Sequence, residues 1–234
     1  MKKKILIIIC LVLVALAITA ILFLKQKIWF VFPNESIFQV YGLDVSHHQG
    51  KIKWDEVDKK YKFVFVKATE AITFVDKRFH ENSLEIKRTQ RLFGAYHFFH
   101  FDYDGSAQAK NYIKTAGNTI ELPPVVDFEF TGVISERECK RLLSELRKCI
   151  NALEKHYKTN VIIYTTEDAY EQVVKGNFDN PIWYRSIFKT VDENMENLLF
   201  WQYHNSATID GIDGIVDLNV FKGTLESLKA LCSF

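Results

Sequence analysis

Two carboxylates lie inside a stretch of sequence that is otherwise suited to a protein core. Asp127 and Glu129 occur in "PVVDFEF" (residues 124–130), where every other residue is apolar. Burying two like charges side by side is costly, so such a pair indicates a function. Two carboxyl groups in an enclosed site push their pKa values apart, which leaves one protonated near neutral pH while the other stays charged. Cleavage of a glycosidic bond requires this division of roles.

The spacing of these acids predicts that they point the same way. Side chains two residues apart in a strand share a face. Val125, Asp127 and Glu129 therefore lie on one side of the strand, and the phenylalanines lie on the other. If the phenylalanines pack against surrounding helices, both carboxylates point into a barrel mouth. Asp44 in "YGLDV" and Asp217 in "IVDLN" end the first and last candidate strands. In a closed barrel they would be neighbours, and four acids would surround one cavity.

Other polar and aromatic residues fall at the ends of candidate strands and fit a sugar site. Aromatic faces stack on the apolar faces of pyranose rings, and amides and hydroxyls bind their substituents. The amide of Gln202 needs a hydrogen-bonding partner, because it lies in a strand between two aromatic residues. The candidate substrate-binding residues are Lys67, Glu70, Tyr96, His97, Tyr164, Trp183, Gln202 and Tyr203.

The elements that must position these residues alternate between strand-like and helix-like patterns from Tyr41 onward. Such alternation predicts an α/β fold, an irregular (β/α) barrel with eight strands and fewer helices, with its chemistry at the carboxyl ends of the strands. Strands are expected at 41–45, 62–69, 92–99, 124–130, 161–165, 181–184, 199–203 and 215–219, and helices at 54–60, 76–90, 105–116, 135–156 and 167–174.

The N-terminal segment is of a different kind. Residues 5–24 are 20 consecutive uncharged residues, which as a helix would span the roughly 30 Å hydrocarbon layer of a bilayer. The apolar region of a cleaved signal peptide is shorter, so we expect an uncleaved transmembrane helix. The predicted organisation is a membrane anchor with its flanks at 1–33, a connector at 34–40 and a catalytic domain at 41–234.

Composition limits the class of protein further. The chain has 234 residues, of which 48% are hydrophobic and 25% charged, as in an ordinary globular protein. Residues 34–234 carry 25 basic and 29 acidic side chains, a net charge of −4. This mildly acidic balance argues against nucleic acid as a partner.

Six motifs together resemble a known family. "YGLDVSHHQG", "FVKATE", "GAYHFF", "PPVVDFE", "FWQY" and "DGIDGIVDLNVF" occur in this order and resemble glycoside hydrolase family 25, the lysozymes of the N-acetylmuramidase type, over residues 41–221. The resemblance implies hydrolysis of the β-1,4 bond between N-acetylmuramic acid and N-acetylglucosamine in peptidoglycan. It also implies that Glu129 is the proton donor, that Asp127 stabilises or orients the reacting sugar, and that Asp44 and Asp217 are the remaining acids of the site.

The resemblance leaves the second half of the reaction open. An aspartate could attack directly or activate water, or the 2-acetamido group of the substrate could be the nucleophile while Asp127 holds it. We favour the last route because an acetamide needs only one positioned carboxylate. The chain also departs from the family pattern at Ala71, where many members have glycine, and at Arg185, where many have a small residue. Arg185 places a cation at the cleft and joins the candidate substrate-binding residues.

The expected partners follow from this reading. We expect a monomer that needs no metal or cofactor, anchored by one helix, with the enzyme outside the cytoplasm where peptidoglycan lies. One alternative is a metal-dependent polysaccharide deacetylase that uses Asp44, His47, His48, His97 and Asp127, but no HxH or HxxxH pair is present. A second is a non-catalytic glycan-binding module, against which the presence of all four acids argues.

Overall fold

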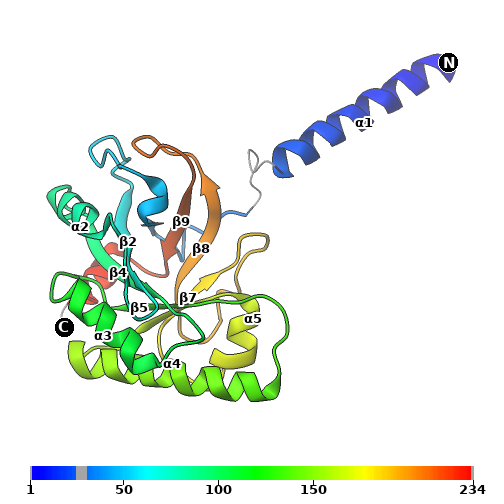
Figure 1. Cartoon of the computed structure of the whole chain (residues 1–234). Helices are drawn as coiled ribbons and strands as arrows, with labels where there is room; N and C mark the ends of the chain where they lie inside the picture. Colours follow the sequence, from blue (N-terminus) through cyan, green and yellow to red (C-terminus); the bar gives the residue numbers. More distant parts are fainter. Residues whose placement is uncertain (1, 25–30, 233–234) are drawn as a thin grey trace. The chain divides into compact units, whose positions relative to one another are not determined.

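The structure, a computed structural model, describes residues 2–24 and 31–232 of the chain. The chain divides into two compact units, Met1–Val31 and Phe32–Phe234. The first contains the helix α1 (Lys2–Leu24; Figure 1). Its segment Lys3–Ile21 is long and apolar enough to cross a membrane, judged by length and composition alone. The expected helix is therefore present, while its place in a membrane stays a prediction.

The second unit contains a closed barrel. Its eight barrel strands pair in the order β1, β9, β8, β7, β6, β5, β4 and β2, and pairing of β2 with β1 closes the ring. A two-residue strand, β3, pairs with the end of β2. The predicted irregular barrel is thus confirmed. The strands are β1 (Val40–Val45), β2 (Tyr61–Glu70), β3 (Phe74–Val75), β4 (Leu92–Phe98), β5 (Val125–Phe128), β6 (Ile162–Thr165), β7 (Ile182–Arg185), β8 (Leu198–Ala207) and β9 (Val216–Phe221).

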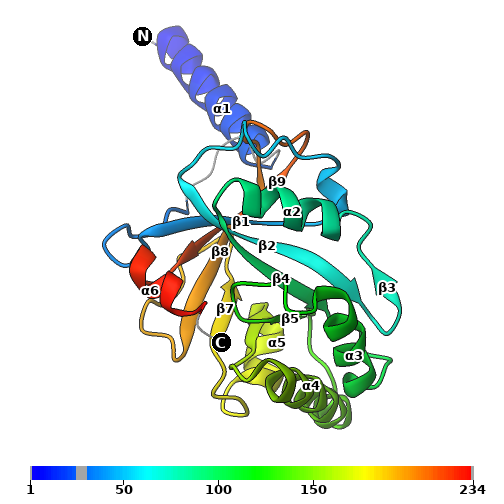
Figure 2. The same ribbon diagram turned by 90° about the vertical axis from the view of Figure 1, so that its left-hand side faces the viewer.

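Helices cover the barrel unevenly. The helices α2 and α3 both pack against β2, and α3 packs against α4, so these helices lie along one flank (Figures 1 and 2). Among the described residues, the connections from β7 to β8 and from β8 to β9 contain no helix, as expected. The helical elements of this unit are η1 (a 3₁₀ turn, His47–Gln49), α2 (Phe79–Arg88), α3 (Gly105–Ala116), α4 (Glu136–Tyr157), α5 (Glu167–Ala169), η2 (a π-helix, Tyr170–Val174) and α6 (Leu225–Ala230).

The direction of β9 differs from that of a regular parallel barrel. This strand runs antiparallel to both of its neighbours, β1 and β8. Asp217 therefore lies at the start of its strand, not at the end as expected. Because β9 is reversed, its start reaches the rim where the parallel strands end, and Asp217 pairs directly with Asp44 of β1. The two acids are neighbours, as predicted, although the direction assumed for the strand that contains Asp217 was wrong.

Aromatic side chains fill the lower part of the barrel interior. Phe65 stacks on Trp183 with ring centroids 4.8 Å apart, and Phe63 meets Phe200 at 5.2 Å. Such packing needs small residues on adjacent strands. A Cβ atom on Gly42 would lie 2.4 Å from the ring of Phe63, so only glycine leaves room for that ring. The interior is therefore a packed core beneath the rim and not a channel.

The helix expected at 54–60 does not form, and this segment is a series of turns. The guanidinium group of Arg91 donates hydrogen bonds to the backbone oxygens of Trp54 (3.3 Å) and Val57 (2.6 Å). In a helix these oxygens would accept from amides four residues ahead. The side chain of Arg91, which is distant in sequence, thus donates to these backbone oxygens and stabilises turns in place of a helix.

Two further helices differ from expectation at their ends. The helix expected at 76–90 begins only at Phe79, because the Asp76 carboxylate accepts hydrogen bonds from the backbone N–H groups of Arg78 (2.8 Å) and His47 (2.9 Å) and fixes a turn. The helix expected at 167–174 is one α-helical turn that continues as the π-helix η2. The helices expected at 105–116 and 135–156 form within a residue of their predicted bounds.

Candidate active site

A layer of polar side chains lies on top of the aromatic core, at the carboxyl ends of the parallel strands. On each barrel strand, alternate residues face inward, and near the rim the inward-facing residue is polar or charged. Each strand thereby contributes to one cluster. Its members are Asp44 on β1, Lys67 on β2, Tyr96 on β4, Asp127 on β5, Tyr164 on β6, Arg185 on β7, Gln202 on β8 and Asp217 on β9.

Asp44 and Asp217 form a pair of carboxyl groups held by amides. Gln202 Nε2 donates to Asp44 Oδ2 at 2.9 Å and to Asp217 Oδ2 at 3.3 Å. Burial and the neighbouring Asp44 raise the pKa of Asp217 to about 9. Burial also raises the pKa of Asp44, while hydrogen bonds from Asn219 and Gln202 oppose that rise. At neutral pH Asp217 therefore holds its proton beside Asp44.

Asn219 is a support of this pair that the sequence reasoning missed. Its Nδ2 donates to Asp44 Oδ2 at 2.7 Å, and its Oδ1 accepts from Trp183 Nε1 at 2.8 Å. Asn219 lies two residues beyond Asp217 on the same inward face, and this spacing could have identified it. Trp183 is only 2% exposed, so it acts through this chain of hydrogen bonds and does not offer a ring face to a ligand.

Asp127 and Glu129 form the second pair, and their carboxyl groups have no hydrogen-bonding partner among the described residues. Asp127 Oδ1 is buried without a partner. Burial, followed by the charges of Glu129 and Asp44, raises the pKa of Asp127 well above its usual value. Burial also raises the pKa of Glu129, and the positive charge of Arg185 opposes this rise. Both groups are therefore biased toward the protonated form.

The phenylalanines of "PVVDFEF" face away from the acids, as the alternation predicts. Phe128 lies 5.6 Å from Phe99, 5.4 Å from Phe101 and 6.0 Å from Phe130, measured between ring centroids. This aromatic cluster lies outside the barrel ring and fixes β5. The strand ends at Phe128, so Glu129 extends from the first residue beyond it, toward open space.

A pocket of about 470 Å³ opens beside Glu129 at the rim. Tyr164 on its wall donates a hydrogen bond to Gln202 Oε1 at 3.0 Å, which orients the amide toward the acids. Lys67, near the same acids, is bound to Glu70 at 2.7 Å. Burial, followed by the charges of nearby Asp44 and Asp127, raises the pKa of Tyr96 well above its usual value. The pocket is lined by Phe98, Glu129, Phe130, Thr131, Tyr164, Thr166, Arg185, Gln202, Asn205 and Asp217.

Four of the candidate substrate-binding residues are not members of this cluster: Glu70 is paired with Lys67, Trp183 is buried beneath the rim, and His97 and Tyr203 face away from it. His97 is fully buried on the other face of β4, where it bonds Thr69 Oγ1 (2.7 Å) and Gln108 Oε1 (3.1 Å). Burial lowers the pKa of His97 to about 4, so its ring is neutral. Tyr203 follows inward-facing Gln202 and is buried beside Trp201 at 6.0 Å. Adjacent residues of a strand point to opposite faces, which explains both placements.

The histidines proposed as metal ligands in the deacetylase alternative have other contacts. His47 Nδ1 lies 2.7 Å from Asp76 Oδ2, and its ring lies 4.1 Å from that of His48. Within residues 2–24 and 31–232, no group of three or more His, Cys, Asp or Glu side chains is arranged to hold a metal ion. The side-chain geometry thus supplies no ligand set for that alternative.

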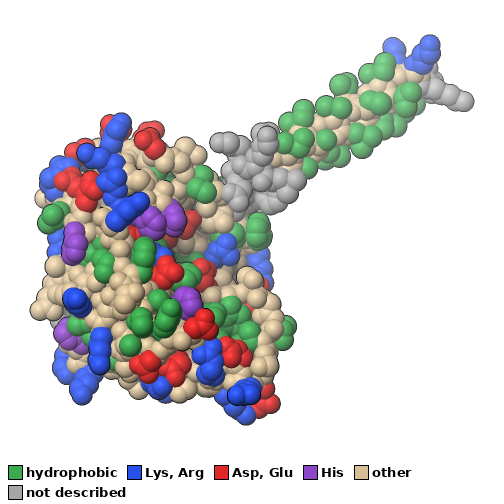
Figure 3. All heavy atoms as spheres, in the orientation of Figure 1, with side chains coloured by type: hydrophobic (Ala, Val, Ile, Leu, Met, Phe, Trp, Pro, Cys, Tyr) green, Lys and Arg blue, Asp and Glu red, His purple; other side chains and the backbone are tan. Residues whose placement is uncertain are grey.

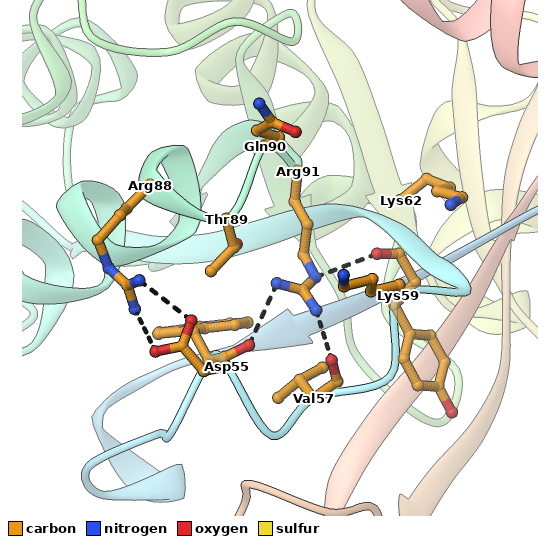
Figure 4. Close-up of a pocket in the computed structure, with 10 residues that line it drawn as sticks. Asp55, Val57, Lys59, Lys62, Arg88, Thr89, Gln90 and Arg91 are labelled. Carbon is orange, nitrogen blue, oxygen red and sulfur yellow. Dashed lines mark hydrogen bonds and ion pairs between the residues drawn. The ribbon is translucent and has the colours of Figure 1, made fainter.

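A second pocket, of about 370 Å³, lies where the chain enters β2 and β4, at the opposite ends of these strands from the acids (Figure 4). Its two arginines are engaged in holding the fold. Arg88 is paired with Asp55 at 2.7 Å, and Arg91 binds backbone oxygens, including that of Tyr61 at 3.2 Å. Charges of both signs also mix over the face shown in Figure 3. The acid cluster at the rim is therefore the stronger candidate site.

The chain forms an eight-stranded β/α barrel with pairs of carboxyl groups at its rim, beside a pocket. These features are typical of a glycoside hydrolase. The profile of the Glycosyl hydrolases family 25 matches residues 43–212. The chain therefore belongs to glycoside hydrolase family 25, as the sequence motifs indicated.

Individual relatives agree with this assignment. The chain is 32% identical over 202 residues to the uncharacterized protein YegX of Escherichia coli K12, covering 82% of this chain and 73% of YegX. It is 32% identical over 213 residues to Lysozyme M1 of Streptomyces globisporus, covering 83% and 71% of the two chains. The structure of a family 25 glycosyl hydrolase from Bacillus anthracis superposes with a TM-score of 0.74 at 36% identity, covering 82% of this chain and 93% of that one.

Proposed function

We propose that this glycoside hydrolase is a muramidase that cleaves the β-1,4 bond between N-acetylmuramic acid and N-acetylglucosamine in peptidoglycan. Membership of the family and similarity to Lysozyme M1 support the substrate. The observation that carries the mechanism is the position of Glu129, which has a raised pKa, lines the rim pocket and makes no hydrogen bond among the described residues. Glu129 is the general acid and donates its proton to the glycosidic oxygen.

Asp127 is the partner of Glu129 in this mechanism. Its buried Oδ1 has no hydrogen-bonding partner in the part of the chain that the structure describes, and leaving such an atom unpaired costs about 1–3 kcal/mol. The N–H of a 2-acetamido group of the substrate would donate the missing hydrogen bond to Oδ1 of Asp127. Asp127 would then orient the acetamide so that its carbonyl oxygen attacks the anomeric carbon as the glycosidic bond breaks. Water subsequently opens the intermediate, with Glu129 as the base.

Analysis of the reaction products tests the function. Purified peptidoglycan is digested with the domain comprising residues 34–234, and the new reducing-end sugars are identified by mass spectrometry. We expect muramic acid ends from the parent enzyme. Glucosamine ends would contradict the bond assigned here, and intact chains that the protein still binds would indicate a glycan-binding module.

We propose further that residues 1–33 are a membrane anchor, 34–40 a connector and 41–234 the catalytic domain, which acts outside the cytoplasm as a monomer. The apolar helix α1 and the wall-directed activity support export. Membrane fractionation of the full chain, with a chain lacking residues 2–24 as the control, tests the anchor. Recovery of the mature protein in the soluble fraction without residues 1–33 would show cleavage instead. Light scattering of the domain tests the monomer.

A further inference from the structure

Arg185 is a cation at the rim that the proposed mechanism leaves unused. It is the last residue of β7, two positions beyond the inward-facing Trp183, so its side chain lies at the rim. It pairs across the sheet with Gln202, the amide that binds Asp44 and Asp217. Arg185 also lines the rim pocket together with Glu129.

The guanidinium group of Arg185 has no hydrogen bond or ion pair among the described residues. Three other buried or pocket-lining cations have partners: Arg88 is bound to Asp55, Arg91 to backbone oxygens, and Lys67 to Glu70. A guanidinium group carries five N–H donors in a planar fork that matches a carboxylate. A partly buried fork that the protein leaves open, directed into a pocket, is suited to an anionic ligand.

The neighbouring acids do not take this role. Arg185 acts on Glu129, Asp44 and Asp217 through its charge and opposes the rise of their pKa values, but it forms no hydrogen bond or ion pair with any of these three described residues. Asp217 holds a proton at neutral pH, and Asp44 is already bound by Gln202 and Asn219. The fork therefore remains open in the free enzyme.

We propose that Arg185 binds a carboxylate of the substrate beside the scissile bond and thereby sets which peptidoglycan strands are cleaved. This inference rests on the proposed function. Two groups of peptidoglycan could supply the carboxylate. One is the lactyl carboxylate of muramic acid, which is free only where the stem peptide has been removed. The other is a carboxylate of the stem peptide itself.

Three matched substrates separate these sources. The first is glycan whose stem peptides have been removed, the second is the same glycan with its lactyl carboxylates converted to neutral methyl amides, and the third is uncrosslinked glycan that keeps its peptides. The values of kcat and KM are measured for the parent, Arg185→Met and Arg185→Lys. Arg137→Met is the control, because Arg137 is exposed on α4 and does not line the rim pocket.

The expected result is a selective loss. A charge-assisted hydrogen-bonded pair contributes about 1.5–3 kcal/mol, so Arg185→Met should lower kcat/KM about 10- to 100-fold on the substrate that carries the bound carboxylate, mainly through KM. The neutral amide should be affected far less. Arg185→Lys, which keeps the charge but loses the fork, should fall between the parent and Arg185→Met. Loss on the peptide-free glycan identifies the lactyl carboxylate, and loss on the peptide-bearing glycan alone identifies the stem peptide.

Removal of this charge also changes the protonation of Glu129, which alters the rate on all three substrates together. The ratio of kcat/KM between the charged and neutral substrates cancels that common effect. Equal ratios for the parent and Arg185→Met on all substrates would overturn the proposal. If the parent itself cleaves none of the three substrates, the proposed function fails instead, so the two failures are distinguishable.

Discussion

The two carboxyl pairs at the rim are built differently. Asp44 and Asp217 are held by Gln202 and Asn219, whereas Asp127 and Glu129 have no hydrogen-bonding partner among the described residues. The first pair is satisfied by the protein itself and is fixed in place. The second carries unmet hydrogen-bonding capacity in a buried setting, which the protein tolerates at a cost to stability. The difference suggests that the first pair positions the site and the second reacts with the substrate.

The largest effect should come from the open pair. Glu129→Gln removes the proton that the leaving oxygen requires, and loss of general acid catalysis costs about 10²- to 10⁴-fold in kcat. Binding of peptidoglycan should persist, because the glutamine keeps the shape of the side chain. Release of reducing ends and pull-down on insoluble peptidoglycan measure the two properties. Glu136→Gln, on the exposed surface of α4, serves as the control. Reducing ends released by Glu129→Gln at the parent rate would refute its role as the acid.

Asp127→Asn should lower kcat by about 10²-fold or more, because the carboxyl group that orients the acetamide and offsets the charge developing in the transition state is lost. The melting temperature at pH 7 should not fall, since a buried ionisable group without partners is replaced by a neutral one. De-N-acetylated glycan provides the complementary test. If Asp127 acts through the acetamide, the parent should lose activity on this glycan, and Asp127→Asn should add little further loss. Undiminished cleavage of the de-N-acetylated glycan by the parent would exclude that route.

The held pair should respond mainly in stability. Asn219→Ala leaves both the Trp183 N–H and Asp44 short of a partner, which should cost about 2–4 kcal/mol in the free energy of unfolding. Urea denaturation at pH 7 measures this loss. Asn205→Ala, at the wall of the rim pocket, is the matched control and should change stability by less than about 1 kcal/mol. Equal losses in both variants would remove the distinction between the pairs.

The last effect concerns pH. The pKa of Asp217 is about 9 in the folded protein and near 3.8 when unfolded, so between these values the folded chain keeps a proton that the unfolded chain releases. The contribution of Asp217 to stability is therefore fully present below pH 4 and is lost as the pH rises toward 9. Asp217→Asn cannot titrate. The difference in unfolding free energy between Asp217→Asn and the parent should shift in favour of the variant from pH 4 to pH 9, and a constant difference would argue against the raised pKa.

Much of this site could be predicted from the sequence because period-two alternation is a local property. It places Asp127 with Glu129, and the strand count brings Asp44 beside Asp217. The same rule, applied strictly, would have excluded His97 and included Asn219, since neighbours in a strand cannot both face inward. The apolar residues on the same strand indicate which of two adjacent residues at the rim faces inward.

Other features depend on distant parts of the chain and have no local signal. The reversed direction of β9 leaves its alternation unchanged, so the sequence pattern is the same for either direction. The turns at 54–60 form because Arg91, more than 30 residues away, binds their backbone oxygens. The ion pair of Lys67 with Glu70 likewise depends on how the strands assemble at the rim. The same assembly leaves the guanidinium group of Arg185 without a hydrogen bond or ion pair among the described residues.

The pairing of β1 with β9 also has a consequence for synthesis of the protein. Asn219 and Asp44, which are 175 residues apart in the chain, must meet before the held pair exists. A chain still emerging from the ribosome, or one cut short before β9, has an open barrel and lacks Asp217 altogether. Contacts between such distant residues form late in folding. The acid cluster of the hydrolase is therefore complete only when its last strand is in place, and a chain that lacks β9 should be inactive.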